Sequence, residues 1–107
     1  MIGGMTLTDL PISKEDFAHL FLYLQSVDIS KICDGRTLKL TRKFLSKHMN
    51  KDEDTITEVC KYCNNHGGFC DCEVVYNVIY DVFSTNEEYG FYARKVLTEM
   101  RKEVINK

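Results

Sequence analysis

The stretch CEVVYNVIYDVF, residues 72–83, decides the fold class of this chain. It is rich in β-branched and aromatic residues, which favour a strand. Val74, Val78 and Val82, however, recur every four residues, a spacing that places them on one face of a helix. No other part of the chain alternates clearly enough to supply a partner strand. We therefore predict a helix over residues 72–83 and an all-α protein.

Four further segments are expected to be helical. The chain has a single proline, Pro11, and four of its six glycines stand in pairs, so few residues interrupt helices. Elsewhere the apolar residues recur mainly at helical spacings, which gives each segment an apolar face. The pair Gly67-Gly68 supplies the left-handed residue that ends one helix. The predicted helices span residues 14–27, 35–48, 55–66, 72–83 and 86–105.

Polar residues before these helices are candidate N-caps, whose side chains accept hydrogen bonds from the first backbone N–H groups. Ser13 stands before the first helix and is followed three residues later by Asp16, as in a weak capping box. The expected caps of the next three helices are Asp34 or Thr37, then Asp54, then Asp71.

Length and composition indicate one compact domain over residues 1–107, with residues 1–12 irregular. Hydrophobic residues make up 44% and charged residues 28%, which is enough to build one core. The net charge is -2 and no long basic block occurs, so nucleic acid is not an expected partner. No apolar run approaches a membrane span, and the start of the chain lacks the features of a secretory signal. A cytoplasmic protein without membrane contact is therefore expected.

Five cysteines without a secretory signal argue against a structural disulfide framework. Cys60 and Cys63 have the Cys-x-x-Cys spacing of metal and redox sites, but they share an apolar helix face with Ile56 and Val59. Free cysteine is among the most buried residue types, so core packing is the favoured interpretation of this pair.

Cys70 and Cys72 differ, because they follow two glycines at a chain reversal and precede a predicted helix. The positive end of a helix favours a thiolate and lowers its pKa. A disulfide between two such close thiols would close a strained ring, whereas one metal ion fits between them more easily. Cys33-Asp34 precedes the second helix as Cys70-Asp71 precedes the fourth, so Cys33 is the natural third ligand.

A tetrahedral zinc site needs four ligands, or three with a water molecule. His66, four residues before Cys70, is the preferred fourth ligand, with Cys63 and Asp34 as alternatives. His66 has an equally good structural interpretation, in which it interacts with the last carbonyl groups of its own helix. The predicted metal ligands are Cys33, Cys70, Cys72 and His66, and zinc is the expected ion.

Two other functions remain open. A metal-free interaction module or homodimer would use its cysteines for packing and a surface such as Tyr89, Phe91 and Tyr92 for a protein partner. A thiol redox protein would require a lowered pKa at Cys70 or Cys72. No catalytic residues are identified, and an enzyme is the less expected outcome.

Two stretches together resemble a small bacterial domain-of-unknown-function family. They are HGGFCDCEVVYNV and, upstream, CDGRTLKLTRKFL, and the resemblance covers about residues 31–80. The family motif is Gly-Gly-aromatic-Cys-Asp-Cys-Glu with an upstream Cys-Asp, and the resemblance implies no activity. The residues that it assigns to the family pattern are Cys33, Asp34, Thr37, Gly67, Gly68, Cys70, Asp71, Cys72, Glu73 and Asn77.

Overall fold

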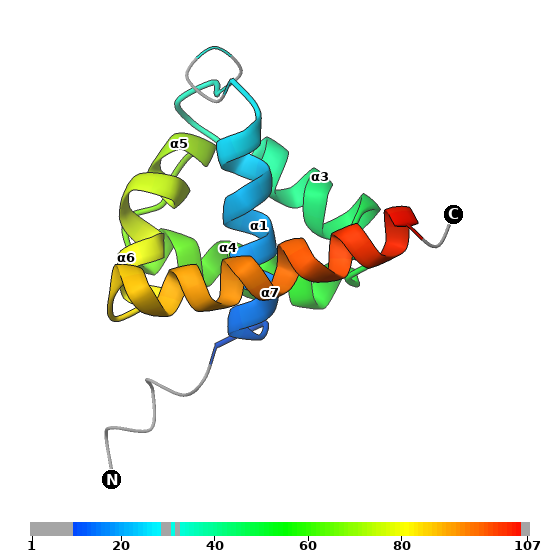
Figure 1. Ribbon diagram of the computed structural model, residues 1–107. Coiled ribbons are helices and arrows are strands. Elements are labelled where there is room, and N and C mark those ends of the chain that lie inside the picture. Colours follow the sequence, from blue (N-terminus) through cyan, green and yellow to red (C-terminus); the bar gives the residue numbers. More distant parts are fainter. Residues whose placement is uncertain (1–9, 29–30, 32, 106–107) are drawn as a thin grey trace, which may run out of the picture.

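The computed structural model describes residues 10–28, 31 and 33–105, with side chains up to residue 100. Within these residues the chain forms five helical segments and no strand, which confirms the predicted all-α fold (Figure 1). Residues 1–9, most of the segment expected to be irregular, lie outside the described residues. Four segments are single helices: α1 (Lys14–Ser26), α3 (Lys39–Lys47), α4 (Glu53–Asn65) and α7 (Asn86–Ile105). The fifth consists of three contiguous elements, α5 (Asp71–Glu73), η2 (Val74–Val78) and α6 (Ile79–Val82), and we call it helix 71–82.

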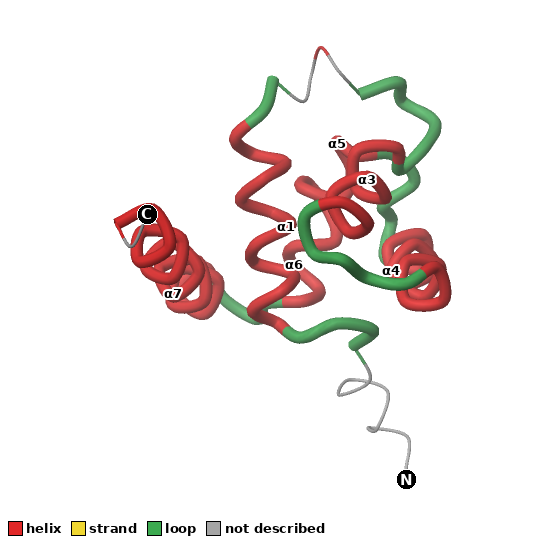
Figure 2. Tube along the Cα trace, turned by 90° about the vertical axis from the view of Figure 1, so that its right-hand side faces the viewer, coloured by secondary structure: helices red, strands yellow, loops and turns green. Residues whose placement is uncertain are grey.

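α1 is the central helix, because it contacts α3, helix 71–82 and α7. Figure 2 shows α7 on one side of α1 and the other helices on the opposite side. The start of α1 follows the prediction, since the Asp16 N–H donates to Ser13 Oγ at 3.0 Å. The buried face of α1 consists of Phe17, Ala18, Leu20, Phe21 and Leu24.

α3 begins later than the sequence predicted, at Lys39 rather than at residue 35. The Asp34 carboxylate accepts hydrogen bonds from the N–H groups of Arg36 and Thr37, both at 2.8 Å, and from the Thr37 hydroxyl. These bonds form a closed turn over residues 34–37, which keeps them out of the helix. Asp34 and Thr37 therefore cap a turn and not α3, so this predicted cap is wrong.

The cap of α4 was also predicted at the wrong residue. Asp52 rather than Asp54 accepts the capping hydrogen bond, from the Thr55 N–H at 2.9 Å. Asp54 is already in the first turn of the helix, where its charge suits the helix dipole. The predicted apolar face is confirmed, since Ile56, Val59, Cys60 and Cys63 are all buried.

Helix 71–82 confirms that the opening stretch is helical and not extended. Val74, Val78 and Val82 are buried on one face, as their spacing predicted. Val74–Val78 form a π-helical turn, which the sequence did not predict. Because a π-helical turn holds more residues than an α-helical turn, a spacing of four keeps Val74 and Val78 on the same side.

Gly67 and Gly68 bring the start of helix 71–82 close to the end of α4. Gly67 has a φ of +86°, the left-handed conformation expected of a residue that ends a helix. The Asn77 amide donates to the Gly67 carbonyl oxygen at 2.8 Å, which fixes this turn. A Cβ on Gly68 would lie 2.6 Å from Val78 Cγ2, so only glycine allows this close approach.

α7 has the predicted bounds and packs on α1. Glu88 connects the two helices at their starts, since it pairs with Lys14 and accepts the Ser84 N–H at 2.7 Å. Tyr89 and Tyr92 contact Phe83, while the Phe91 side chain is 57% exposed. The expected interaction surface is thus largely part of the packing. No helix in the described part of the chain is long and apolar enough to cross a membrane.

Candidate thiol site

Cys33, Cys70 and Cys72 meet in the structure, and these three residues are called the thiol cluster. Cys33 lies in the loop before α3, and the other two lie at the start of helix 71–82. The Cys72 N–H and the Gly35 N–H each donate to Cys33 Sγ, with both donor–sulfur distances 3.4 Å. The thiols of Cys70 and Cys72 also lie close enough to Cys33 to influence its pKa. The sulfur of Cys33 is therefore the centre of the cluster.

Asp71 holds the two parts of the site together. Its carboxylate accepts hydrogen bonds from the Leu40 N–H at 2.9 Å, the Thr41 N–H at 3.0 Å and the Thr41 hydroxyl at 2.8 Å. Its side chain is almost completely buried. Asp71 was predicted to cap its own helix, and this is wrong, because it caps α3 across a separation of about 30 residues. We call this set of three hydrogen bonds the Asp71 clamp.

Asp71 does not occupy the N-cap position of its own helix, so its carboxylate can accept hydrogen bonds from α3 instead. Cys70 is the N-cap residue of helix 71–82 and makes no side-chain capping bond. Glu73 instead accepts the Phe69 N–H at 3.0 Å, which fixes the chain just before the helix. At α3 the N-cap position is Leu38, which has no polar side chain to offer. The first N–H groups of each helix find acceptors outside that helix, since those of α3 donate to Asp71 and that of Cys72 donates to Cys33 Sγ.

The thiol cluster is electrostatically asymmetric. Burial acts to raise the pKa of Cys33, but the hydrogen bonds from Cys72, Gly35 and Cys70 outweigh it and lower this pKa below its ordinary value. Burial, the hydrogen bond to Cys33 and the charge of Cys33 raise the pKa of Cys72 to about 11. Burial likewise raises the pKa of Cys70. The thiolate thus forms first on Cys33, and the predicted lowering at Cys70 or Cys72 is wrong.

The structure places His66 away from the thiol cluster. Its Nδ1 is hydrogen-bonded to Asp81 Oδ2 at 2.9 Å, and its ring stacks on Tyr62 with 4.1 Å between ring centroids. Asp81 lies near the far end of helix 71–82, on the order of 10 Å along the axis from Cys72. Three of the four predicted metal ligands therefore come together, and the fourth faces a carboxylate at the other end of the helix.

The alternative fourth ligands are engaged elsewhere. Cys63 is buried in the core, and burial raises its pKa to about 12. The carboxylate of Asp34 is held by the turn before α3. Cys60 is also buried, which confirms that Cys60 and Cys63 pack in the core. In the described residues, no group of three or more His, Cys, Asp or Glu side chains is arranged to hold a metal ion.

The family model for "Protein of unknown function (DUF2695)" matches residues 20–77, more than half of the chain. The matched segment starts earlier and ends slightly sooner than the resemblance suggested. It contains the whole thiol cluster and both partners of the Asp71 clamp, Leu40 and Thr41. No curated protein and no solved structure matches the chain. The chain belongs to the DUF2695 family of proteins of unknown function.

Proposed function

We propose that this protein is a thiol redox protein whose thiol cluster exchanges with low-molecular-weight disulfides. The observation that supports the proposal is one sulfur, Cys33 Sγ, which accepts two backbone N–H bonds and has two further cysteines beside it. Backbone N–H groups stabilise a thiolate, which is the attacking species in disulfide exchange. A neighbouring thiol then supplies the second half of a disulfide.

The exchange takes two steps. The Cys33 thiolate attacks one sulfur of the small disulfide, so that a mixed disulfide forms and the other half leaves as a thiolate that takes a proton from water. Cys72 then gives its proton to water, attacks the Cys33 sulfur and displaces the remaining half as a thiolate. Cys33 and Cys72 are oxidised to a disulfide, and the small disulfide is reduced to two thiols.

The first step prepares the second. In the reduced protein the pKa of Cys72 is about 11, with burial as the largest cause and the hydrogen bond to Cys33 and the Cys33 charge as further causes. A mixed disulfide on Cys33 carries no charge, so these two contributions disappear. Cys72 then loses its proton more easily, so that a larger fraction of it is present as the thiolate that attacks the mixed disulfide.

Oxidised glutathione is a suitable probe, with the products mapped by mass spectrometry of the digested protein. Wild-type protein should form a disulfide between Cys33 and Cys72, whereas Cys72→Ser should accumulate the glutathione adduct on Cys33. Cys33→Ser should react slowly at every thiol. Cys60→Ala is the matched control, since Cys60 is buried in the core, and it should behave as wild type. A first adduct on any cysteine other than Cys33 would contradict the proposal.

A second candidate is a structural zinc site on the same three thiols. Two observations support it. The three thiols come from two separate segments, the loop before α3 and the start of helix 71–82, and two backbone N–H groups would stabilise Cys33 Sγ as a ligand. The thiol side chains would have to rotate toward a common centre, and the ion would join loop 33–37 to helix 71–82. Metal analysis of reduced protein, purified without chelator, distinguishes the candidates: about one zinc per chain favours the structural site. Protein that contains no metal, and in which all five cysteines are free thiols, favours the redox site.

A further inference from the structure

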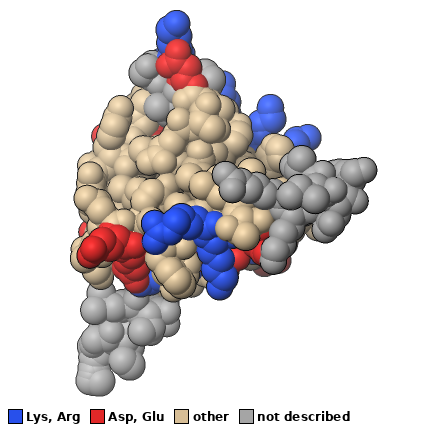
Figure 3. All heavy atoms as spheres, in the orientation of Figure 1, with Lys and Arg blue, Asp and Glu red and all other residues tan. Residues whose placement is uncertain are grey.

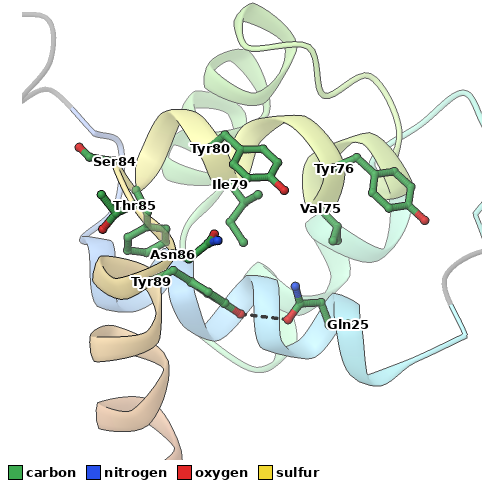
Figure 4. Close-up of a pocket in the computed structure, with 10 residues that line it drawn as sticks. Gln25, Val75, Tyr76, Ile79, Tyr80, Ser84, Thr85, Asn86 and Tyr89 are labelled. Atoms are coloured by element: carbon green, nitrogen blue, oxygen red, sulfur yellow. Dashed lines mark hydrogen bonds between the residues drawn. The ribbon is translucent and has the colours of Figure 1, made fainter.

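A cleft of about 620 Å³ opens between helix 71–82, the end of α1 and the start of α7 (Figure 4). Its volume lies within the range of small-molecule sites, about 300–1,000 Å³. None of the thiol-cluster residues lines it, so any function that it has is separate from thiol chemistry. Its lining includes Gln25 of α1, Val75, Tyr76, Ile79 and Tyr80 of helix 71–82, and Asn86 and Tyr89 of α7.

The cleft is uncharged. None of its described lining residues is a Lys, Arg, Asp, Glu or His, although 28% of the chain is charged. In the view of Figure 3, the area above α7 is almost entirely uncharged, while Lys, Arg, Asp and Glu side chains lie along α7, at the top and on the right of the molecule. A charged ligand would lose its hydration here without gaining an ionic partner, so the lining favours a neutral one.

Aromatic side chains form the walls of the cleft. Tyr80 is 69% exposed and Tyr76 is 61% exposed, so most of each residue is not covered by the rest of the protein. In Figure 4, Tyr80 and Tyr89 lie on opposite sides of the cleft with Ile79 between them, and Val75 lies beside Ile79, toward Tyr76. Exposed aromatic faces above an apolar floor are suited to stacking on a planar ring.

Two side-chain amides supply hydrogen-bonding groups at the edges of the same cleft. The Asn86 amide points into the cleft in Figure 4. The Tyr89 hydroxyl donates to Gln25 Oε1 at 3.0 Å, which leaves the Gln25 amide nitrogen as a donor toward the cleft. Asn and Gln amides present paired donors and acceptors, the pattern that they use to bind the edge of adenine.

We propose that this cleft binds a small neutral nitrogen heterocycle of the purine type, stacked on Tyr80 and hydrogen-bonded by Asn86 and Gln25. The neutral lining disfavours a phosphate group, and the exposed tyrosine rings favour a flat ligand. The ligand is a free base or nucleoside. A nucleic acid is disfavoured because its phosphates would meet no basic side chain in the lining.

The test is a titration of the full chain with adenine, followed by NMR of the backbone amides. Chemical-shift changes should cluster at residues that line the cleft and leave the thiol cluster unchanged. Tyr80→Ala should weaken binding roughly five- to 150-fold, the effect expected for the loss of one stacking contact. Phe91→Ala is the matched control, since Phe91 is also an exposed ring, 57% against 69% for Tyr80, and lies on α7 outside the cleft, and it should bind as wild type.

Three results would overturn the proposal. The first is the absence of shift changes at the cleft with adenine at millimolar concentration. The second is equal affinity of the Tyr80→Ala and wild-type proteins, with the fold of each confirmed by circular dichroism. The third is binding of an adenine oligonucleotide without binding of free adenine, which would assign the cleft to a nucleic acid.

Discussion

Replacing Asp71 with alanine should break the connection between the two helix starts that carry the thiol cluster. The carboxylate accepts three hydrogen bonds, from the Leu40 and Thr41 N–H groups and from the Thr41 hydroxyl. Because the side chain is only 1% exposed, water has no direct access to the donors that would be left. Asp71→Ala would therefore leave two backbone N–H groups and one hydroxyl without an acceptor.

The expected loss of stability is large for a protein of this size. A buried polar group without a partner costs about 1–3 kcal/mol, so the two N–H groups alone give a loss of about 3 kcal/mol. The total free energy of unfolding of a domain this size is about 5–15 kcal/mol. With a urea dependence of about 1.5 kcal/mol per M, the unfolding midpoint should fall by roughly 2 M.

Urea unfolding followed by far-ultraviolet circular dichroism measures this shift. Asp34→Ala is the matched control, because Asp34 also accepts two N–H bonds and one threonine hydroxyl bond but lies at the surface. Water replaces the lost acceptor there, so the midpoint should move much less. Equal shifts for the two variants would refute the argument that burial of the clamp determines its contribution. A double-mutant cycle with Thr41→Val then isolates the hydroxyl bond.

Two further changes test the packing and the charges. Gly68→Ala should lower the free energy of unfolding by about 1–3 kcal/mol, because the new Cβ would lie 2.6 Å from Val78 Cγ2. Gly90→Ala should instead stabilise α7 by about 0.5–1 kcal/mol, since its Cβ meets only the end of Arg94, and urea unfolding measures both changes. Hydrogen bonds from the Thr37 hydroxyl and the N–H groups of Arg36 and Thr37 lower the pKa of Asp34 from 3.8 to about 2. The stability that this carboxylate contributes is present above pH 3.8 and lost as the pH falls to about 2, so wild type and Asp34→Asn should converge in stability over that range.

The helices could be predicted because their buried faces follow a local repeat. Phe17, Leu20 and Leu24 recur at helical spacing, and the structure buries all three. Val74, Val78 and Val82 repeat in the same way, although β-branched residues favour strands. The burial of one helix face therefore outweighed the preference of valine for strands. The spacing that predicts this face can be found in a few neighbouring residues.

The caps were harder to predict, because a sequence rule assigns each polar capping side chain to the nearest helix start. The rule held for Ser13, whose partner is three residues away. It failed for Asp71, whose donors Leu40 and Thr41 lie about 30 residues earlier in the chain. Only the packing of α3 against helix 71–82 determines that pairing, and no local signal encodes it.

The candidate site was likewise predicted correctly in one part and wrongly in another. The repeated Cys-Asp before two predicted helices suggested that Cys33 and the Cys70–Cys72 pair meet, and they do. His66 is close to Cys70 in sequence, but the left-handed Gly67 turns the chain after α4. The side chain of His66 then lies against Asp81. Proximity in sequence therefore gave the wrong neighbour where the backbone reverses direction.

The π-helical turn at Val74–Val78 has a consequence for chain length. Such a turn accommodates one extra residue without rotating the helix that follows it. A relative one residue shorter in this turn would form a regular α-helix there, and Asp71 would still face α3 while Val82 still faced the core. The same deletion in the middle of α1 would rotate every later residue of that helix by about 100°. We therefore expect a single-residue deletion to be tolerated better in this turn than in the middle of α1.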